Sequence, residues 1–147
     1  MLSAAQISSI ERIVASEAGV RRTLITGLAS SEELQQLAII YNWDDGFDLP
    51  AAIADHPACD LGVALTLFWL AEAVVWWTRD FPPSEYNRDW QSFCESISQR
   101  ILDGRYATGE TSFRFPMSRV QLYKLQKLNM PDVFLKDVTG IHDAPEL

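Results

Sequence analysis

Asp44, Asp45 and Asp48 lie close together in one short segment, and carboxylates at such spacing could bind a cation. Residues 42–50 read Asn-Trp-Asp-Asp-Gly-Phe-Asp-Leu-Pro. A calcium loop of the EF-hand type needs acids at alternating positions, then Gly, then a distant Glu. Here two acids are adjacent and Gly46 comes too early for that pattern. We therefore predict no metal and no cofactor, and we expect Asp44 or Asp45 to form an Asx-type turn in which Gly46 supplies a positive φ.

The three Asp residues belong to a long stretch of the chain whose charges all have one sign. Residues 23–78 contain eight acids and no Lys or Arg, whereas the segments before and after carry net charges of +1 and −1. The net charge of −8 therefore lies in about one third of the sequence. A surface of one sign that also carries aromatic residues suits a basic protein partner.

Two aromatic rings, Trp43 and Phe47, flank the acidic turn, and two interpretations of them are open. In the first, both rings pack between the neighbouring helices and anchor the loop. In the second, one ring stays exposed beside the carboxylates, a composition that suits the binding of Arg or Lys. In this second interpretation, the partner-binding residues are Trp43, Asp44, Asp45, Phe47, Asp48 and Asp55.

His56 and Asp60 could form an acid/base pair, and no other residues in the sequence come closer to the composition of a catalytic site. No nucleophile accompanies the pair, and Asp60 is well placed to cap the helix that follows it. Cys59 lies at the same helix start, where the helix dipole would favour a thiolate, but a lone Cys beside an apolar helix is more often part of the core. The two His and two Cys residues also lack zinc-site spacing. We therefore predict no catalytic residues and a protein that is not an enzyme.

Length and composition indicate one domain over residues 1–147. The first residues lack a basic start followed by an apolar run, and two Cys are too few for a disulfide scaffold, so we expect a cytoplasmic protein. A pI of about 4.6 argues against nucleic-acid binding. The longest apolar run, residues 61–77, is interrupted by Glu72 and fits a buried central helix better than a membrane span.

Helical spacing of apolar residues runs through nearly the whole chain and predicts an all-α fold. We expect a compact single-domain helical bundle or a short α-solenoid-like array of about six to seven helices. The capping boxes at Ser3 and Ser30 begin two of them, and Gly19 ends the first. The clearest other helices are expected at 50–55, 60–77, 84–102, 118–128 and 131–138. Residues 111–115 are expected to pair briefly as a strand, and the tail from residue 139 is expected to be loose.

Joined motifs in the first half of the chain carry a family resemblance. They are Leu37-Ala38-x-x-Tyr41-Asn42-Trp43-Asp44-Asp45-Gly46-Phe47-Asp48-x-Pro50, then Ile53, Pro57, Cys59-Asp60-x-Gly62-x-Ala64-Leu65 and Phe68-Trp69. This stretch resembles a family of small bacterial domains with no assigned biochemical function, with a core at about residues 32–79 and a C-terminal helical extension at 84–138. By analogy of class, such domains are similar to the helical immunity proteins of bacterial toxin systems.

The resulting hypothesis is a non-catalytic, acidic protein-binding module that inhibits a basic bacterial toxin or effector domain. A structural or adaptor domain without an inhibitory role is the alternative, and an enzyme of unknown reaction is the third. Residues 111–131 carry Arg114, Arg119, Lys124 and Lys127 and no acid, so this basic segment could cover the acidic region within the molecule. Head-to-tail self-association is a further possibility. The sequence leaves these alternatives open.

Overall fold

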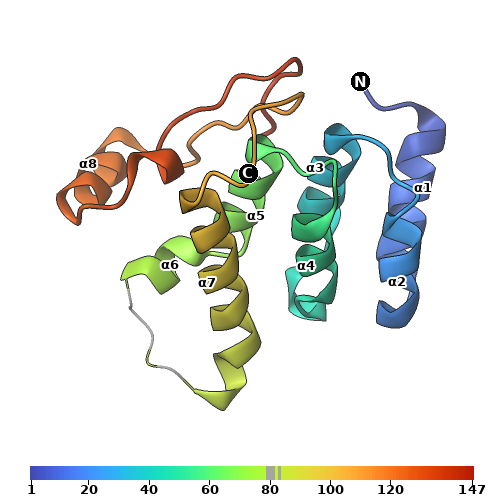
Figure 1. Cartoon of the computed structure of the whole chain (residues 1–147), viewed down its shortest axis with the longest axis horizontal. Coiled ribbons are helices and arrows are strands. Elements are labelled where there is room, and N and C mark those ends of the chain that lie inside the picture. The colour runs from blue at the N-terminus through green and yellow to red at the C-terminus, as the bar shows by residue number, and fades with distance from the viewer. Residues whose placement is uncertain (79–81, 83) are drawn as a thin grey trace.

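The computed structural model describes residues 1–78, 82 and 84–147, and the described residues form eight α-helices (Figure 1). Three short 3-10 turns are labelled η. The predicted all-α fold is confirmed. The helices are α1 (Ala4–Ala15), α2 (Ala18–Ile25), α3 (Ser31–Ile40), α4 (Asp48–Asp55), α5 (Leu61–Leu70), α6 (Ala73–Thr78), α7 (Arg88–Leu102) and α8 (Arg119–Lys127), and the turns are η1 (Trp43–Asp45), η2 (Glu85–Asn87) and η3 (Asp132–Phe134).

Successive helices stack side by side as a short array. Helix α3 packs between α1 and α5, and α2 packs against α4, so that the first five helices form two adjoining rows (Figure 1). Helix α7 then covers α5. This arrangement favours the solenoid-like description over a simple bundle for the first two thirds of the chain.

Helix α5 is the centre of the core. Its residues from Gly62 to Trp69 are all buried, as expected for a helix that is apolar on every side. The predicted helix over 60–77 is wrong in one respect, because it breaks after Leu70 and resumes as α6. Glu72 has the left-handed φ of 57° at the break. The Ala71 carbonyl accepts a hydrogen bond from Trp90 Nε1 at 2.7 Å, which draws that carbonyl away from the helical pattern. Within the described ranges, no helix is both long enough and apolar enough to cross a membrane.

The two predicted capping boxes differ in how fully they form. The Ser3 hydroxyl accepts from Gln6 N while Gln6 Oε1 accepts from Ser3 N. At α3, the Ser30 hydroxyl accepts from Glu33 N, and Glu33 reaches back to that hydroxyl and to Ala29 N. Ser30 is thus the expected N-cap, although Glu33 does not bond to its backbone.

Several predicted helix ends are wrong, and hydrogen bonds explain two of them. The first helix ends at Ala15 rather than Gly19, because the Ser16 backbone N–H and hydroxyl bond to the preceding turn. Gly19 lies inside α2 instead. Helix α4 starts at Asp48, before Pro50, and η2 precedes α7. The expected helix over 131–138 is only the turn η3, because Val138 exchanges backbone hydrogen bonds with Phe113. That bridge confirms the brief strand pairing expected within 111–115.

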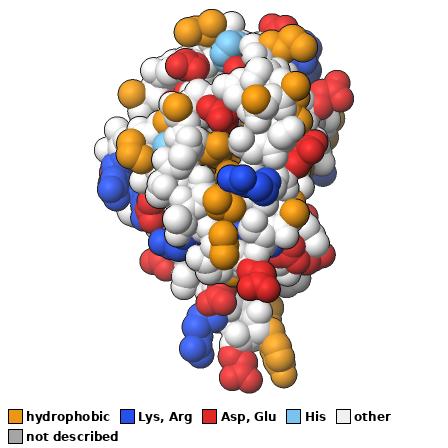
Figure 2. All heavy atoms as spheres, turned by 90° about the vertical axis from the view of Figure 1, so that its right-hand side faces the viewer, with side chains coloured by type: hydrophobic (Ala, Val, Ile, Leu, Met, Phe, Trp, Pro, Cys, Tyr) orange, Lys and Arg blue, Asp and Glu red, His pale blue; other side chains and the backbone are white. Residues whose placement is uncertain are grey.

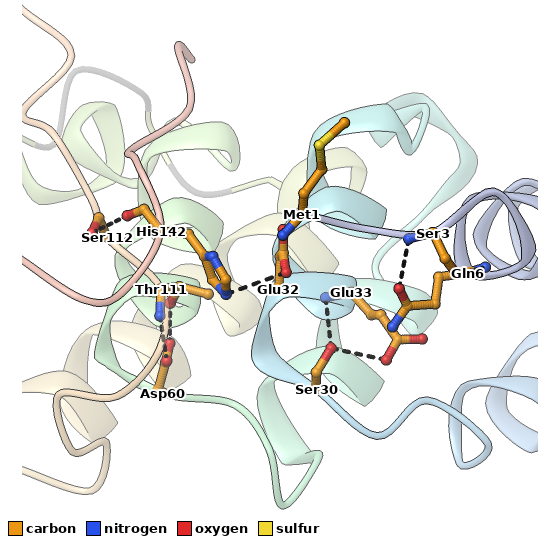
Figure 3. Close-up of polar contacts among 10 residues, drawn as sticks. All are labelled: Met1, Ser3, Gln6, Ser30, Glu32, Glu33, Asp60, Thr111, Ser112 and His142. Carbon is orange, nitrogen blue, oxygen red and sulfur yellow. Dashed lines mark hydrogen bonds and ion pairs between the residues drawn. The ribbon is translucent and has the colours of Figure 1, made fainter.

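The tail after residue 139 is bound to the body of the protein, so the expectation of a loose tail is wrong. Ile141 N donates to Glu110 O at 2.8 Å, and the Ser112 hydroxyl donates to His142 O. His142 Nε2 lies 3.3 Å from a carboxylate oxygen of Glu32 at the start of α3 (Figure 3). These contacts form between residues far apart in the sequence, where helical periodicity carries no information.

Candidate functional site

The acidic loop between α3 and α4 is an ordered turn. The Asn42 side chain accepts from Asp44 N at 3.1 Å, so Asn42 forms the Asx-type turn that had been expected of Asp44 or Asp45. Gly46 has a φ of 102°, as predicted. The Tyr41 hydroxyl donates to Gly46 O at 2.8 Å and closes the loop. Burial and the charge of Asp48 raise the pKa of Tyr41 to about 12, so this hydroxyl keeps its proton at neutral pH.

Trp43 and Phe47 anchor this loop to the core, as the first interpretation expects. Trp43 Nε1 donates to Ala38 O at 3.0 Å. The ring of Trp43 makes edge contacts with Phe47 and with Phe93 of α7, at centroid distances of 6.1 and 6.0 Å. Both rings are nevertheless only partly buried, and each lines a groove at the surface. The loop is therefore held rigidly while the edges of its rings remain accessible.

Two of the predicted partner-binding acids already have intramolecular cations. Asp55 Oδ1 lies 2.6 Å from Arg100 Nη1 of α7, and Asp45 Oδ2 lies 3.7 Å from Arg21 Nη2 of α2. The guanidinium of Arg21 also lies over the ring of Tyr41, 5.5 Å from its centroid. Asp45 and Asp55 thus help to hold α2, α4 and α7 together, which lowers their value as contacts for a partner.

The basic segment of residues 114–127 does not neutralise the acidic region through ion pairs. Among the described residues, none of its four Lys and Arg side chains lies within ion-pair distance of an acid. Helix α8 lies at the opposite end of the molecule from α1 and α2 (Figure 1). The outer face of α1 and α2 shows acidic and basic side chains interspersed (Figure 2). Neutralisation of the acidic region comes instead from Arg21, Arg100 and the N-terminus, and His142 lies beside Glu32.

Three acids of residues 23–78 are left without a cation or a capping role among the described residues: Asp44, Asp48 and Glu72. Asp44 and Glu72 are exposed. One carboxylate oxygen of Asp48, Oδ2, is buried and has no hydrogen-bond partner in the described part of the chain. Asp48 lies in the first turn of α4, where the helix dipole favours its charge.

These three acids line two grooves that share Phe47. The α4–α7 groove has a volume of about 350 Å³ and contains Asp48; the loop groove has a volume of about 330 Å³ and contains Asp44 and Glu72. The α4–α7 groove is lined by Phe47, Asp48, Ala51, Ala54, Asp89, Ser92, Phe93, Ser96, Ile97 and Arg100. The loop groove is lined by Trp43, Asp44, Gly46, Phe47, Leu70, Ala71, Glu72 and Trp90.

Glu72 and Trp90 were not among the predicted site residues. The sequence offered one signal for Glu72, because it is a lone charge within the apolar run of residues 61–77. Trp90 carried no such signal, since an aromatic residue on an amphipathic helix is usually part of the core. Glu72 lies at the break between α5 and α6, and Trp90 of α7 bonds to the Ala71 carbonyl there, so both residues lie beside the loop.

Asp60 and His56, the pair considered for catalysis, make hydrogen bonds within the fold. The Asp60 carboxylate accepts from Val63 N at 3.0 Å and from the backbone N–H and hydroxyl of the buried Thr111 (Figure 3). His56 Nδ1 accepts from Ala58 N at 3.0 Å, which closes the turn after α4. Burial, and next the charge of Asp60, raise the pKa of the Cys59 thiol well above its usual range, so it is not a thiolate. Within the described residues, no group of three or more His, Cys, Asp or Glu residues could hold a metal ion.

The glycine of the Cys59-Asp60-x-Gly62 motif has a packing role. A Cβ atom at Gly62 would lie only 2.4 Å from Thr111 Oγ1, so a side chain there would push Thr111 away from the capping carboxylate. Gly109 is similarly close to Asp60. This motif therefore couples the start of α5 to the C-terminal segment.

Residues 29–102 match the family described as Domain of unknown function (DUF4274), which is 74 of the 147 residues. The chain belongs to the DUF4274 family. No curated protein and no solved structure shows a significant match. The DUF4274 segment runs from Ala29 to the end of α7, so it contains every residue that lines the loop groove and the α4–α7 groove. Thr111 and His142, which bind Asp60 and Glu32, lie outside it.

Proposed function

We propose that this protein is a non-catalytic, acidic protein-binding module, and most specifically an immunity protein that inhibits a basic bacterial toxin or effector domain in the bacterial cytoplasm. The observation that supports it best is the state of Asp44 and Asp48. Neither has a cation partner among the described residues, and they lie in two grooves that share the anchored ring of Phe47. Unpaired carboxylates beside rigid aromatic groups match the composition of binding sites for basic proteins.

The proposed mechanism is steric and electrostatic blockade. Asp44 and Asp48 pair with the cations by which the toxin binds its own substrate, and Trp43 and Phe47 provide the desolvated contact at the centre. Because hydrogen bonds and ring contacts already fix the loop, little conformational entropy is lost on binding. The net charge of −8 accelerates encounter and makes association sensitive to salt.

The roles of Asp45 and Asp55 differ from those of Asp44 and Asp48. Their carboxylates are paired with Arg21 and Arg100, so we assign them to holding the loop and α4 in place. A partner cation at either carboxylate would share it with the arginine already there. The binding surface is therefore centred on Asp44 and Asp48.

A growth assay tests inhibition directly once the bound partner is known. Expression of that partner alone should arrest bacterial growth, and co-expression of the wild-type protein should restore it. The Asp44→Lys/Asp48→Lys variant should fail to restore growth although it accumulates normally. Rescue by this variant as well as by the wild type would contradict the proposed surface, and a harmless partner would contradict the inhibitor role.

A structural or adaptor role is the alternative, and one observation favours it. Asn42, Trp43, Gly46 and Phe47 all have clear parts in holding the loop, so most of this motif is explained without a partner. If the protein has this role, reversing the charges of Asp44 and Asp48 should leave its binding to other proteins unchanged. The two functions are thus separated by the same variant.

A further inference from the structure

The loop groove has an unusual lining for its size. Three aromatic residues, Trp43, Phe47 and Trp90, and two acids, Asp44 and Glu72, border a space of about 330 Å³, and no Lys or Arg is among the described residues that line it. By contrast, the α4–α7 groove already contains a cation, Arg100. Of the two grooves, only the α4–α7 groove therefore has a Lys or Arg among its described lining residues.

The aromatic lining of the loop groove is rigid. Trp43 Nε1 donates to Ala38 O at 3.0 Å, and Trp90 Nε1 donates to Ala71 O at 2.7 Å. Both indole N–H groups are thus bonded within the protein, and a ligand meets the rings rather than these donors. The bond from Trp90 also ties α7 to the turn at which Glu72 is exposed. The two walls of the groove, the loop and the break between α5 and α6, are consequently fixed before any ligand arrives.

We infer that the loop groove binds one arginine side chain of a basic protein partner, an inference that rests on the proposed function and adds Glu72 and Trp90 to it. A guanidinium is planar, stacks on aromatic faces and donates paired hydrogen bonds to carboxylates. It can therefore stack on the aromatic rings and donate hydrogen bonds to Asp44 and Glu72 at the same time. A lysine ammonium is a compact, strongly hydrated charge, so it gains less from the aromatic walls.

An apolar occupant fits the groove less well. Covering Asp44 and Glu72 with an apolar side chain would remove water from two carboxylates without giving them a donor, which is costly. A guanidinium supplies those donors. Charge complementarity thus selects an arginine over a leucine or phenylalanine from the partner.

Nuclear magnetic resonance of the whole chain tests this inference without knowledge of the partner. The probe is N-acetyl-arginine methylamide, and the neutral control is the citrulline analogue, which has nearly the same shape. We expect the arginine probe to cause a saturable shift of the Trp43 and Trp90 indole N–H signals, and the citrulline probe to bind at least about tenfold more weakly. An absent shift, or equal shifts with both probes, would overturn the inference.

Two double variants, in which the acids are replaced by uncharged amides of the same shape, locate the site. Asp44→Asn/Glu72→Gln should lower the affinity for the arginine probe by about tenfold or more. Both residues are exposed and have no role in capping, so the variant should keep the wild-type melting temperature. Glu11→Gln/Glu146→Gln changes the net charge equally at exposed positions outside both grooves and should bind as the wild type does. Equal binding by the two variants would overturn the inference.

The same variant separates failure of this inference from failure of the proposed function. If a captured partner is lost with Asp44→Lys/Asp48→Lys but binds undiminished to Asp44→Asn/Glu72→Gln, the proposed surface stands and the arginine site is wrong. If the arginine probe binds as expected but inhibition of a partner fails in the growth assay, the site stands and the inhibitor role is wrong.

Discussion

Replacing Asp60 with Ala should destabilise the protein by about 3–5 kcal/mol, far more than the loss of an ordinary helix cap. The Asp60 side chain accepts one hydrogen bond from Val63 N at the start of α5, and the loss of such a cap costs about 1 kcal/mol. It also accepts from the backbone N–H and the hydroxyl of Thr111, which is fully buried. Each of these donors, left buried without an acceptor, costs about 1–2 kcal/mol more.

Urea unfolding followed by far-ultraviolet circular dichroism measures this loss. Ser118→Ala is the matched control, because Ser118 caps α8 with the same geometry at an exposed position. We expect the control to cost about 1 kcal/mol. Thr111→Val removes one donor, and its effect should not add to that of Asp60→Ala, since the two residues share a contact. If Asp60→Ala costs no more than Ser118→Ala, the C-terminal segment is not held by Asp60 and the structural account of this motif is wrong.

Three other changes have sharp expected outcomes. Gly62→Ala should lower the free energy of unfolding by about 1–3 kcal/mol, because its Cβ would lie 2.4 Å from Thr111 Oγ1; an unchanged urea midpoint would contradict that close approach. Burial raises the pKa of the Cys94 thiol to about 12 from 9.0, so Cys94 should react with a thiol reagent far more slowly in the native protein than in urea. Since the folded state holds this proton more tightly, stability should fall as the pH rises from 9 toward 12, and Cys94→Ala should weaken that dependence. Glu72→Gly should leave stability unchanged or raise it by about 0.5–1 kcal/mol, because φ is 57° there, while it weakens binding of the arginine probe; a clear destabilisation in urea would show that the Glu72 side chain supports the fold.

Local patterns in the sequence predicted the features that depend on neighbouring residues. The caps at Ser3, Ser30 and Asp60 follow from short-range hydrogen bonds, and the burial of α5 follows from its apolar composition. Gly46 was identifiable because few other residues tolerate its φ of 102°. Each of these features involves groups no more than four residues apart or the composition of a single helix.

Contacts between distant residues could not be predicted in this way. The break at Ala71 depends on a hydrogen bond from Trp90, nineteen residues later. The neutralisation of Asp55 by Arg100 joins two helices across 45 positions. The second half of the candidate site, Glu72 and Trp90, comes together at that break. Knowledge of the local turn was therefore enough to find Asp44 and Trp43 but not the groove that they border.

Capture of a partner from a lysate of the source organism at low salt tests whether the acidic loop binds a basic protein. The wild type, Asp44→Lys/Asp48→Lys and the charge-matched control Glu11→Lys/Glu146→Lys would be compared side by side, with melting temperatures measured because Asp48 lies in the first turn of α4. We expect the wild type and the control to retain one basic protein that is released by rising salt, and the Asp44/Asp48 variant to retain none while it stays folded. Equal retention of the same protein by all three would show that the acidic loop is not the binding surface.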